Sequence, residues 1–175
     1  MRNTRNNPLE DLGMHLPLIC DRYEIRDDGP PGAGKYRGGA GVIKSQRYLT
    51  SGFMTHESDR HLDAPWGAFG GKAGSVGKME IYNIKDPLNV RQEYSKFSGL
   101  RTNEGDVVSY ISPSGGGFGD PLERDPVKVL DDVLDEIITI ESARDDYGVV
   151  MREVDDGYGW SVNSEATKKL RAEMS

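Results

Sequence analysis

Two stretches of this sequence gather groups that could bind a metal ion or an anion. The first runs from His56 to His61, where two imidazoles are interleaved with two carboxylates and the guanidinium of Arg60. The second is the loop 112–121, in which four of the five residues 115–119 are glycine. Glycine adopts positive φ without steric cost and lets a ligand approach the backbone closely. The first stretch could therefore bind a metal or an anion, and the second could bind an anion.

The first stretch favours an anion over a metal. His56 and His61 are five residues apart, which places them on opposite faces of a strand, so they would share a metal only across a bend. We therefore predict an exposed strand end without a metal. Arg60 suits a carboxylate or phosphate partner, because its planar guanidinium donates two parallel hydrogen bonds. A structural salt bridge is the alternative for Arg60.

The second stretch offers backbone amides. Consecutive N–H groups of Gly115, Gly116 and Gly117 can form a concave anion site. Neither stretch places a histidine beside a plausible nucleophile, so no set of nucleophile, base and orienting group can be assembled. We predict that Arg60 and these three glycines contact a substrate or anion, and that the chain holds no catalytic residue and no metal ligand.

Aromatic residues stand in two glycine-rich loops, with Trp66 and Phe69 in the segment 64–74 and Phe118 in the loop 112–121. Large apolar side chains in loops plug a core, form an interface with another subunit, or line a pocket. For Trp66 and Phe69 we expect a core plug or a subunit interface, with a substrate pocket as the alternative. We assign Phe118 to the same pocket or interface.

The segment Gly29–Lys35 has the spacing of a phosphate-binding P-loop. Such a loop needs Ser or Thr after the lysine to hold Mg²⁺, and this chain has Tyr36. A helix must also follow, whereas Arg37-Gly-Gly-Ala-Gly41 is poorly suited to one. We predict a glycine-rich turn at this position.

The elements that hold these loops change character along the chain. Short runs with apolar alternation predict strands at residues 18–26, 41–51, 53–59, 78–84, 94–100 and 107–111. Turn residues separate them, and Asp86-Pro87 is predicted to be a turn. Such spacing favours an antiparallel sandwich or barrel-like sheet. We therefore predict an α+β chain with a β-rich domain at 1–121 and a helical appendage with a short hairpin at 122–175.

Helix signals follow the glycine loop. Asp125 and Pro126 predict a capped helix start, and an apolar face then recurs at Leu130, Val133, Leu134, Ile137 and Ile138. The acidic residues on the opposite face are expected to be solvated: Asp131, Asp132, Asp135 and Glu136. Further signals predict a helix over 140–147 capped by Thr139, a hairpin of 149–151 with 158–162, and a last helix capped by Asn163.

Composition narrows the class of protein. The formal net charge of −7 opposes binding to nucleic acid or to an anionic membrane, and one cysteine excludes an internal disulfide framework. The sequence shows no membrane span or signal peptide, so we expect a cytoplasmic location. A hydrophobic content of 35% is low for a self-sufficient globule of 175 residues and suggests that folding finishes against a partner.

Several blocks together resemble the hydantoinase B/5-oxoprolinase family, which includes subunits of N-methylhydantoinase and of acetone and acetophenone carboxylases. These blocks are NTRNNPLEDL (3–12), RYEIRDDGPPGAGKYRGGAGV (22–42), DRHLDAPWGAFGGKAG (59–74) and PSGGGFGDPLERDP (113–126), followed by VLDDV and DYGVV. The resemblance extends from about Asn3 to Leu170 and corresponds to the last third or so of a family member. A similar arginine precedes the Pro-Trp-Gly block in the family, as Arg60 does here.

The resemblance implies a division of labour between subunits. A kinase-like, hydantoinase-A-like subunit uses ATP and Mg²⁺ to phosphorylate a carbonyl or amide oxygen, and the hydantoinase-B-like subunit hydrolyses or carboxylates the activated species. In the family the divalent metal is held by the N-terminal part, so we expect it, ATP and Mg²⁺ in partner subunits. The chain would then be a small subunit, structural or loop-donating, that is inactive alone. The alternatives are a stand-alone β-rich module that binds a small anion and a fragment of a longer family member.

Overall fold

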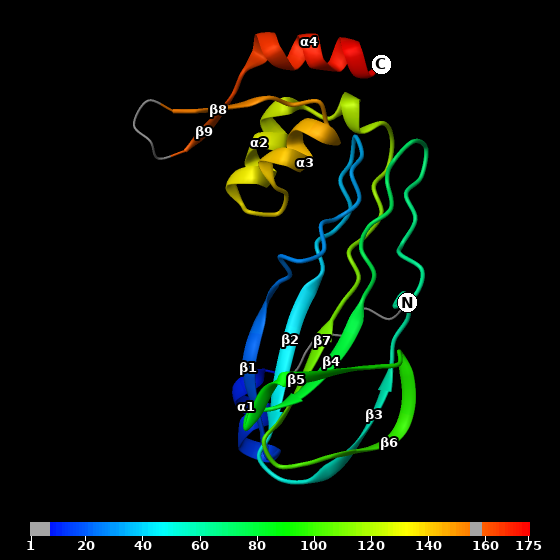
Figure 1. Ribbon diagram of the computed structural model, residues 1–175, viewed down its shortest axis with the longest axis vertical. Coiled ribbons are helices and arrows are strands. Elements are labelled where there is room, and N and C mark those ends of the chain that lie inside the picture. The colour runs from blue at the N-terminus through cyan, green and yellow to red at the C-terminus, as the bar shows by residue number, and fades with distance from the viewer. Residues whose placement is uncertain (1–7, 155–158) are drawn as a thin grey trace. The chain divides into compact units, whose positions relative to one another are not determined.

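The computed structural model describes residues 8–154 and 159–175, drawn in Figure 1. The chain forms two compact units, each built from separate stretches of sequence. The first contains the chain up to Ile25, Val42–His61 and Lys78–Ser112. The second contains Arg26–Gly41, Leu62–Gly77 and Pro113–Ser175.

An open five-stranded antiparallel sheet dominates the first unit (Figure 1). Its strand order is β1-β2-β7-β4-β5, with β1 and β5 as the edge strands. The strands are β1 (Leu18–Ile25), β2 (Val42–Tyr48), β4 (Lys78–Asn83), β5 (Asp86–Glu93) and β7 (Asp106–Ile111). A short helix, α1 (Leu9–His15), precedes β1. The predicted antiparallel strands are thus present, but among the described residues they do not close into a barrel.

A second layer covers one face of this sheet. The strands β3 (Gly52–Glu57) and β6 (Lys96–Thr102) pair antiparallel as a two-stranded sheet. Met54 on β3 packs with Met79, Ile81 and Val108 from the central strands β4 and β7, and all four are buried. Side-chain alternation explains this, because every second residue of β4 faces the same layer. The predicted packing of one antiparallel sheet on another is therefore seen where β3 and β6 cover the central strands.

The edge strand β5 corrects the prediction of a turn at Asp86-Pro87. Residues of β5 are exposed apart from Glu93, which is partly buried, and the strand's two large apolar residues, Leu88 and Val90, are exposed as well. Proline lacks a donor and is tolerated at the start of an edge strand. Pairing with β4, including Met79 with Glu93 and Asn83 with Asp86, holds this polar segment in place.

The second unit contains three glycine-rich loops and the helices that follow them. Its elements are the 3₁₀ turn η1 (Pro121–Glu123), α2 (Pro126–Leu134), α3 (Ile140–Asp145), the hairpin of β8 (Met151–Glu153) with β9 (Trp160–Val162), and α4 (Ser164–Met174). The predicted caps are confirmed. Asp125 accepts from the N–H of Val127, Thr139 from that of Ser142, and Asn163 from that of Ala166. The predicted hairpin turn at 155–157 lies outside the described residues.

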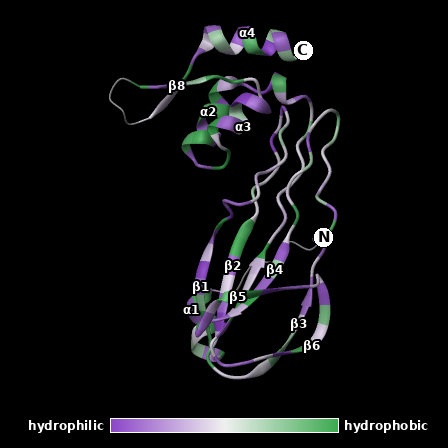
Figure 2. Ribbon diagram, in the orientation of Figure 1, coloured by the Kyte–Doolittle hydropathy of each residue, from purple (hydrophilic) through white to green (hydrophobic). Residues whose placement is uncertain are grey.

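The helix α2 corrects two predictions, although its turns mix hydrophobic and hydrophilic residues as expected (Figure 2). It ends at Leu134, and Glu136 has a φ of +56°, which a continuing right-handed helix cannot contain. Val129 and Val133 enter the core with Ile138, while Leu134 is exposed. Asp132, predicted to be solvated, is buried.

The division into a β-rich domain at 1–121 and an appendage at 122–175 stays a prediction, and the compact units group segments from both sides of residue 121. The glycine-rich loops 26–41 and 62–77 belong to the same unit as the C-terminal helices, although strands of the first unit separate them in sequence. Backbone pairing between distant loops produces this grouping, and a linear reading of element types does not reveal such pairing.

Candidate functional site: the glycine-loop cluster

Three glycine-rich loops of the second unit are joined by their backbones. The N–H of Gly32 donates to the carbonyl of Gly115 at 2.9 Å, and that of Lys72 donates to the carbonyl of Ala33 at 2.7 Å. The N–H of Gly117 donates to the carbonyl of Lys72 at 2.9 Å. Each loop therefore bonds to the other two. Chains that lie this close leave little room for side chains.

The glycines are required by this close approach. A Cβ atom added to Gly32 would lie 2.2 Å from the Lys72 carbonyl oxygen. One added to Gly117 would lie 2.0 Å from the Ala33 carbonyl oxygen. At Gly116 the nearest atom is the Trp66 carbonyl oxygen, also at 2.0 Å. Real Cβ atoms do not make contacts this short with backbone atoms.

These contacts bear on the predicted anion site. The N–H of Gly115 donates to the carbonyl of Gly39 at 2.8 Å, and that of Gly117 is committed to Lys72. An anion could use these two amides only by displacing the carbonyls, so binding at Gly115–Gly117 stays a prediction that carries this cost. Because a Cβ at Gly116 would lie 2.0 Å from the Trp66 carbonyl oxygen, valine at this position is expected to disturb the fold.

Aromatic residues of the three loops meet on the surface of the second unit. The ring centroid of Phe118 lies 5.0 Å from that of Phe69 and 6.3 Å from that of Tyr36. Phe69 and Trp66 are 83% and 71% exposed, so neither plugs the core of this chain. That leaves the interface and the pocket open for them. The sequence did not indicate a role for Tyr36 in this surface, because it was considered only as the residue that replaces the Ser or Thr of a P-loop.

A buried charge network in the second unit includes Asp132 on α2. The Asp132 carboxylate accepts from Arg37 Nε at 3.0 Å on one oxygen and from Arg124 Nη2 at 2.7 Å on the other. Tyr147 is fully buried, its hydroxyl has no hydrogen-bond partner among the described residues, and burial raises its pKa to about 12. Asp132 thus connects α2 to the first glycine-rich loop and to the segment after η1. This role is structural.

The predicted histidine stretch, in the first unit, is bent where the sequence suggested a straight strand. The Nε2 atoms of His56 and His61 each lie 2.9 Å from the hydroxyl of Ser58. Strand β3 includes His56 and ends at Glu57, and the chain beyond it brings His61 back toward His56 at Ser58. Burial lowers the pKa of both imidazoles below 6.5, because it disfavours their charged form.

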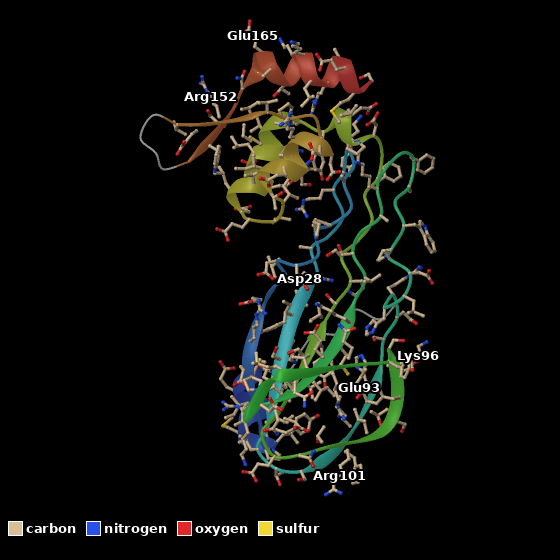
Figure 3. The ribbon with its side chains drawn as sticks, viewed as in Figure 1. Asp28, Glu93, Lys96, Arg101, Arg152 and Glu165 are labelled. Atoms are coloured by element: carbon tan, nitrogen blue, oxygen red, sulfur yellow. The ribbon has the colours of Figure 1, made fainter. Side chains whose placement is uncertain are left out.

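Hydrogen bonding at Ser58 is satisfied within the protein. Its hydroxyl also lies 3.2 Å from the carbonyl oxygen of Ser95, so it can donate there while accepting from both imidazoles. Lys96, at the start of β6 (Figure 3), pairs with Asp59 at 3.0 Å beside the cluster. Throughout residues 8–154 and 159–175, no group of three or more His, Cys, Asp or Glu side chains is placed to hold a metal.

Arg60 lies between these histidines in sequence and has a φ of +66°, an uncommon conformation for arginine. It belongs to the first unit, whereas Gly115–Gly117 belong to the second. Contact of Arg60 with a carboxylate or phosphate ligand stays a prediction.

No helix in the described part of the chain is long and apolar enough to span a membrane.

The family model for hydantoinase B/oxoprolinase matches residues 1–121. The chain belongs to the hydantoinase B/oxoprolinase family. It is 41% identical to a putative B-type subunit of a D-/L-hydantoinase from Pseudomonas sp. (strain NS671), over 97% of this chain and 27% of that protein. It is 26% identical to the acetone carboxylase alpha subunit of Xanthobacter autotrophicus, over 96% of this chain and 26% of that protein.

The fold is shared with a solved structure of the same family. The crystal structure of the ATP-dependent caprolactamase from Pseudomonas jessenii matches 94% of this chain and 28% of its own chain, with a TM-score of 0.76 and 28% identity. The chain spans about a quarter of the length of each of these three proteins. Homologues include hydantoinase, caprolactamase and carboxylase subunits, which confirms the family resemblance drawn from the glycine-rich blocks.

Proposed function

We propose that this hydantoinase-B-like chain acts as a small subunit of an ATP-dependent hydrolase or carboxylase complex. The observation that carries the proposal is its 41% identity, over nearly its whole length, to about a quarter of the D-/L-hydantoinase polypeptide. The substrate class is a cyclic amide such as a hydantoin or lactam, or a small ketone, because the relatives act in hydantoinase, caprolactamase and acetone carboxylase systems.

The proposed role is structural. The glycine-rich loops are joined to one another by backbone hydrogen bonds, which supports a rigid scaffold more than a mobile loop that closes on a substrate. We place ATP, Mg²⁺ and the divalent metal of the reaction in partner subunits, one kinase-like and one hydantoinase-B-like. The isolated chain would then have no activity, and the location would be cytoplasmic.

The test is purification of the affinity-tagged chain from its source cells, followed by native mass spectrometry and identification of each co-purifying protein. We expect two larger polypeptides at fixed stoichiometry, one kinase-like and one hydantoinase-B-like. The complex should hydrolyse a hydantoin or lactam, or carboxylate acetone, only when ATP is present. The matched control is the same complex from cells that lack this chain, which should lose activity. Recovery of the chain only as a monomer of its calculated 19.3 kDa would contradict the proposal.

A further inference from the structure

An exposed aromatic patch lies on the second unit, formed by Tyr36, Phe69 and Phe118. The three side chains are 61%, 83% and 48% exposed, and adjacent ring centroids are 5.0 and 6.3 Å apart. Aromatic side chains are enriched at the centres of protein interfaces, where they bury much area at low entropic cost. Three in contact on one surface therefore point to a protein partner.

The backbone that presents the patch is fixed before any partner arrives. Tyr36 and Phe118 exchange both N–H to carbonyl bonds, at 3.0 and 2.9 Å. On the other side, the N–H of Ala68 donates to the carbonyl of Gly117 and the N–H of Gly119 to that of Ala68, both at 2.9 Å. A preordered surface loses less conformational freedom on binding.

Phe69 is held in an unfavourable conformation at the outer end of the patch. Its φ is +51°, a region that bulky residues rarely adopt. The ring gains little from burial within this chain, since most of its surface is exposed. Unusual backbone geometry that does not serve the core occurs at binding surfaces, where a partner supplies the compensating contacts.

Ion pairs lie in the same loops as the patch. Lys35, next to Tyr36, pairs with Glu123 at 2.8 Å, and Lys72, three residues after Phe69, pairs with Asp146 at 2.6 Å. An apolar centre with polar groups around it is the usual arrangement of a protein interface. The opposite charges of each ion pair cancel, so apolar contact contributes more than charge to the choice of a partner.

The size of the relatives indicates which partner fits. Nearly three quarters of the D-/L-hydantoinase polypeptide and of the caprolactamase beta subunit has no counterpart in this chain, whereas the segment equivalent to this chain is joined to that remainder in one polypeptide. A second copy of this chain is a poorer fit, because a net charge of −7 on each copy opposes self-association.

We propose that the aromatic patch is the surface on which this chain binds a hydantoinase-B-like polypeptide carrying that remainder of the family fold. The inference rests on the proposed function, since it names a surface for one of the proposed partners. Phe69 is the residue to test, because it is the most exposed ring of the three and lies in a fixed loop.

The experiment compares tagged variants in the complex purified from source cells. Phe69→Ala removes the ring, Phe69→Tyr keeps it, and Phe53→Ala removes an aromatic ring of similar exposure (76%) on β3 of the first unit. The amount of hydantoinase-B-like polypeptide recovered per tagged chain is measured first. The dissociation constant is then measured by titrating each variant against that polypeptide separated from the wild-type complex.

We expect Phe69→Ala to raise the dissociation constant by about 30-fold or more, the effect of losing an interface hot spot. Phe69→Tyr and Phe53→Ala should bind close to the wild type. Thermal unfolding of each free variant should match the wild type, because the Phe69 ring is largely exposed.

The possible failures are separable. If the wild-type chain captures no hydantoinase-B-like polypeptide, the proposed function fails and the inference fails with it. If the complex forms and Phe69→Ala binds as well as Phe53→Ala, only the docking surface is refuted. Self-association that Phe69→Ala abolishes would also refute it, because the patch would then bind a second copy.

Discussion

Two adjacent glycines offer a sharp test of how the loop cluster is held together. A Cβ atom at Gly38 would lie 2.0 Å from the Gly115 carbonyl oxygen and 2.5 Å from its carbon. At Gly39 a Cβ would meet nothing within 4 Å. Alanine at either position restricts the unfolded chain equally, so a comparison of Gly38→Ala with Gly39→Ala isolates the folded-state clash.

The expected loss of stability in Gly38→Ala follows from the backbone hydrogen bonds that the added methyl group would disrupt. Ordinary contact begins at 3.4 Å, so alanine at 38 pushes the loops apart by more than 1 Å. That shift would break the bond from the Gly32 N–H to the Gly115 carbonyl and strain the bond from the Gly115 N–H to the Gly39 carbonyl. At about 1–3 kcal/mol for each buried group left unpaired, Gly38→Ala should lower the free energy of unfolding by roughly 3 kcal/mol. Gly39→Ala should be neutral or raise it by about 0.4–1 kcal/mol.

The assay is urea unfolding followed by tryptophan fluorescence. Both tryptophans, Trp66 and Trp160, lie in the second unit, so their emission reports on the unit that contains the loops. Circular dichroism at the same urea concentrations shows whether the two units unfold together. The reasoning is refuted if Gly38→Ala and Gly39→Ala unfold within about 1 kcal/mol of each other, a margin well below the gap expected from the loop contacts.

Three further predictions use the same urea assay. Asp132→Ala should cost about 3–5 kcal/mol, because it leaves two largely buried arginines unpaired, whereas Glu123→Ala at an exposed ion pair should change stability by less than about 1 kcal/mol; equal effects would contradict the buried role. Tyr147→Phe should be neutral or stabilising, since it removes a buried hydroxyl without a described partner, and a clear loss would indicate that the hydroxyl is bonded. Burial lowers the pKa of His56 and His61 from 6.5, so their contribution to stability should be full above that pH and fall as the pH decreases from 6.5 to the folded-state pKa values. The urea midpoint should fall less between about pH 7.5 and about pH 5.5 in a variant with both His56→Gln and His61→Gln than in the wild type. An equal fall in the two proteins would contradict the linkage between these pKa values and stability.

Local sequence signals predicted those parts of the structure that depend on neighbouring residues. The caps at Asp125, Thr139 and Asn163 start helices where expected, because a capping side chain bonds an N–H two or three residues away. The strands β2, β4 and β7 follow from apolar alternation or from β-branched residues along a single segment. The strand β5 was not predicted, because Asp86-Pro87 signals a turn and the pairing with β4 that makes it a strand lies outside the segment itself.

The candidate sites show a similar limit. Spacing placed His56 and His61 on opposite faces of a strand, but the chain leaves β3 at Glu57 and Ser58 joins the two rings. Asp132 looked like one of several solvated carboxylates, and only the approach of Arg37 and Arg124 from elsewhere in the chain shows that it is buried. Arg37 lies far from Asp132 in sequence, beyond the reach of a helical period, whereas Ser58 is close to both histidines and acts through the bend after Glu57, which strand spacing does not show.

By itself, the sequence determined the family, the antiparallel strands, the capped helices and the position of the glycine-rich loops. These follow from short-range backbone preferences and from blocks of residues that occur in a fixed order. The tertiary structure decided which loops pair and which residues the pairing buries or exposes. It commits the amides of Gly115 and Gly117 to carbonyls of other loops and leaves Tyr36, Phe69 and Phe118 together on the surface. The physical reason is that backbone hydrogen bonds between loops depend on distances across the fold, which no local pattern encodes.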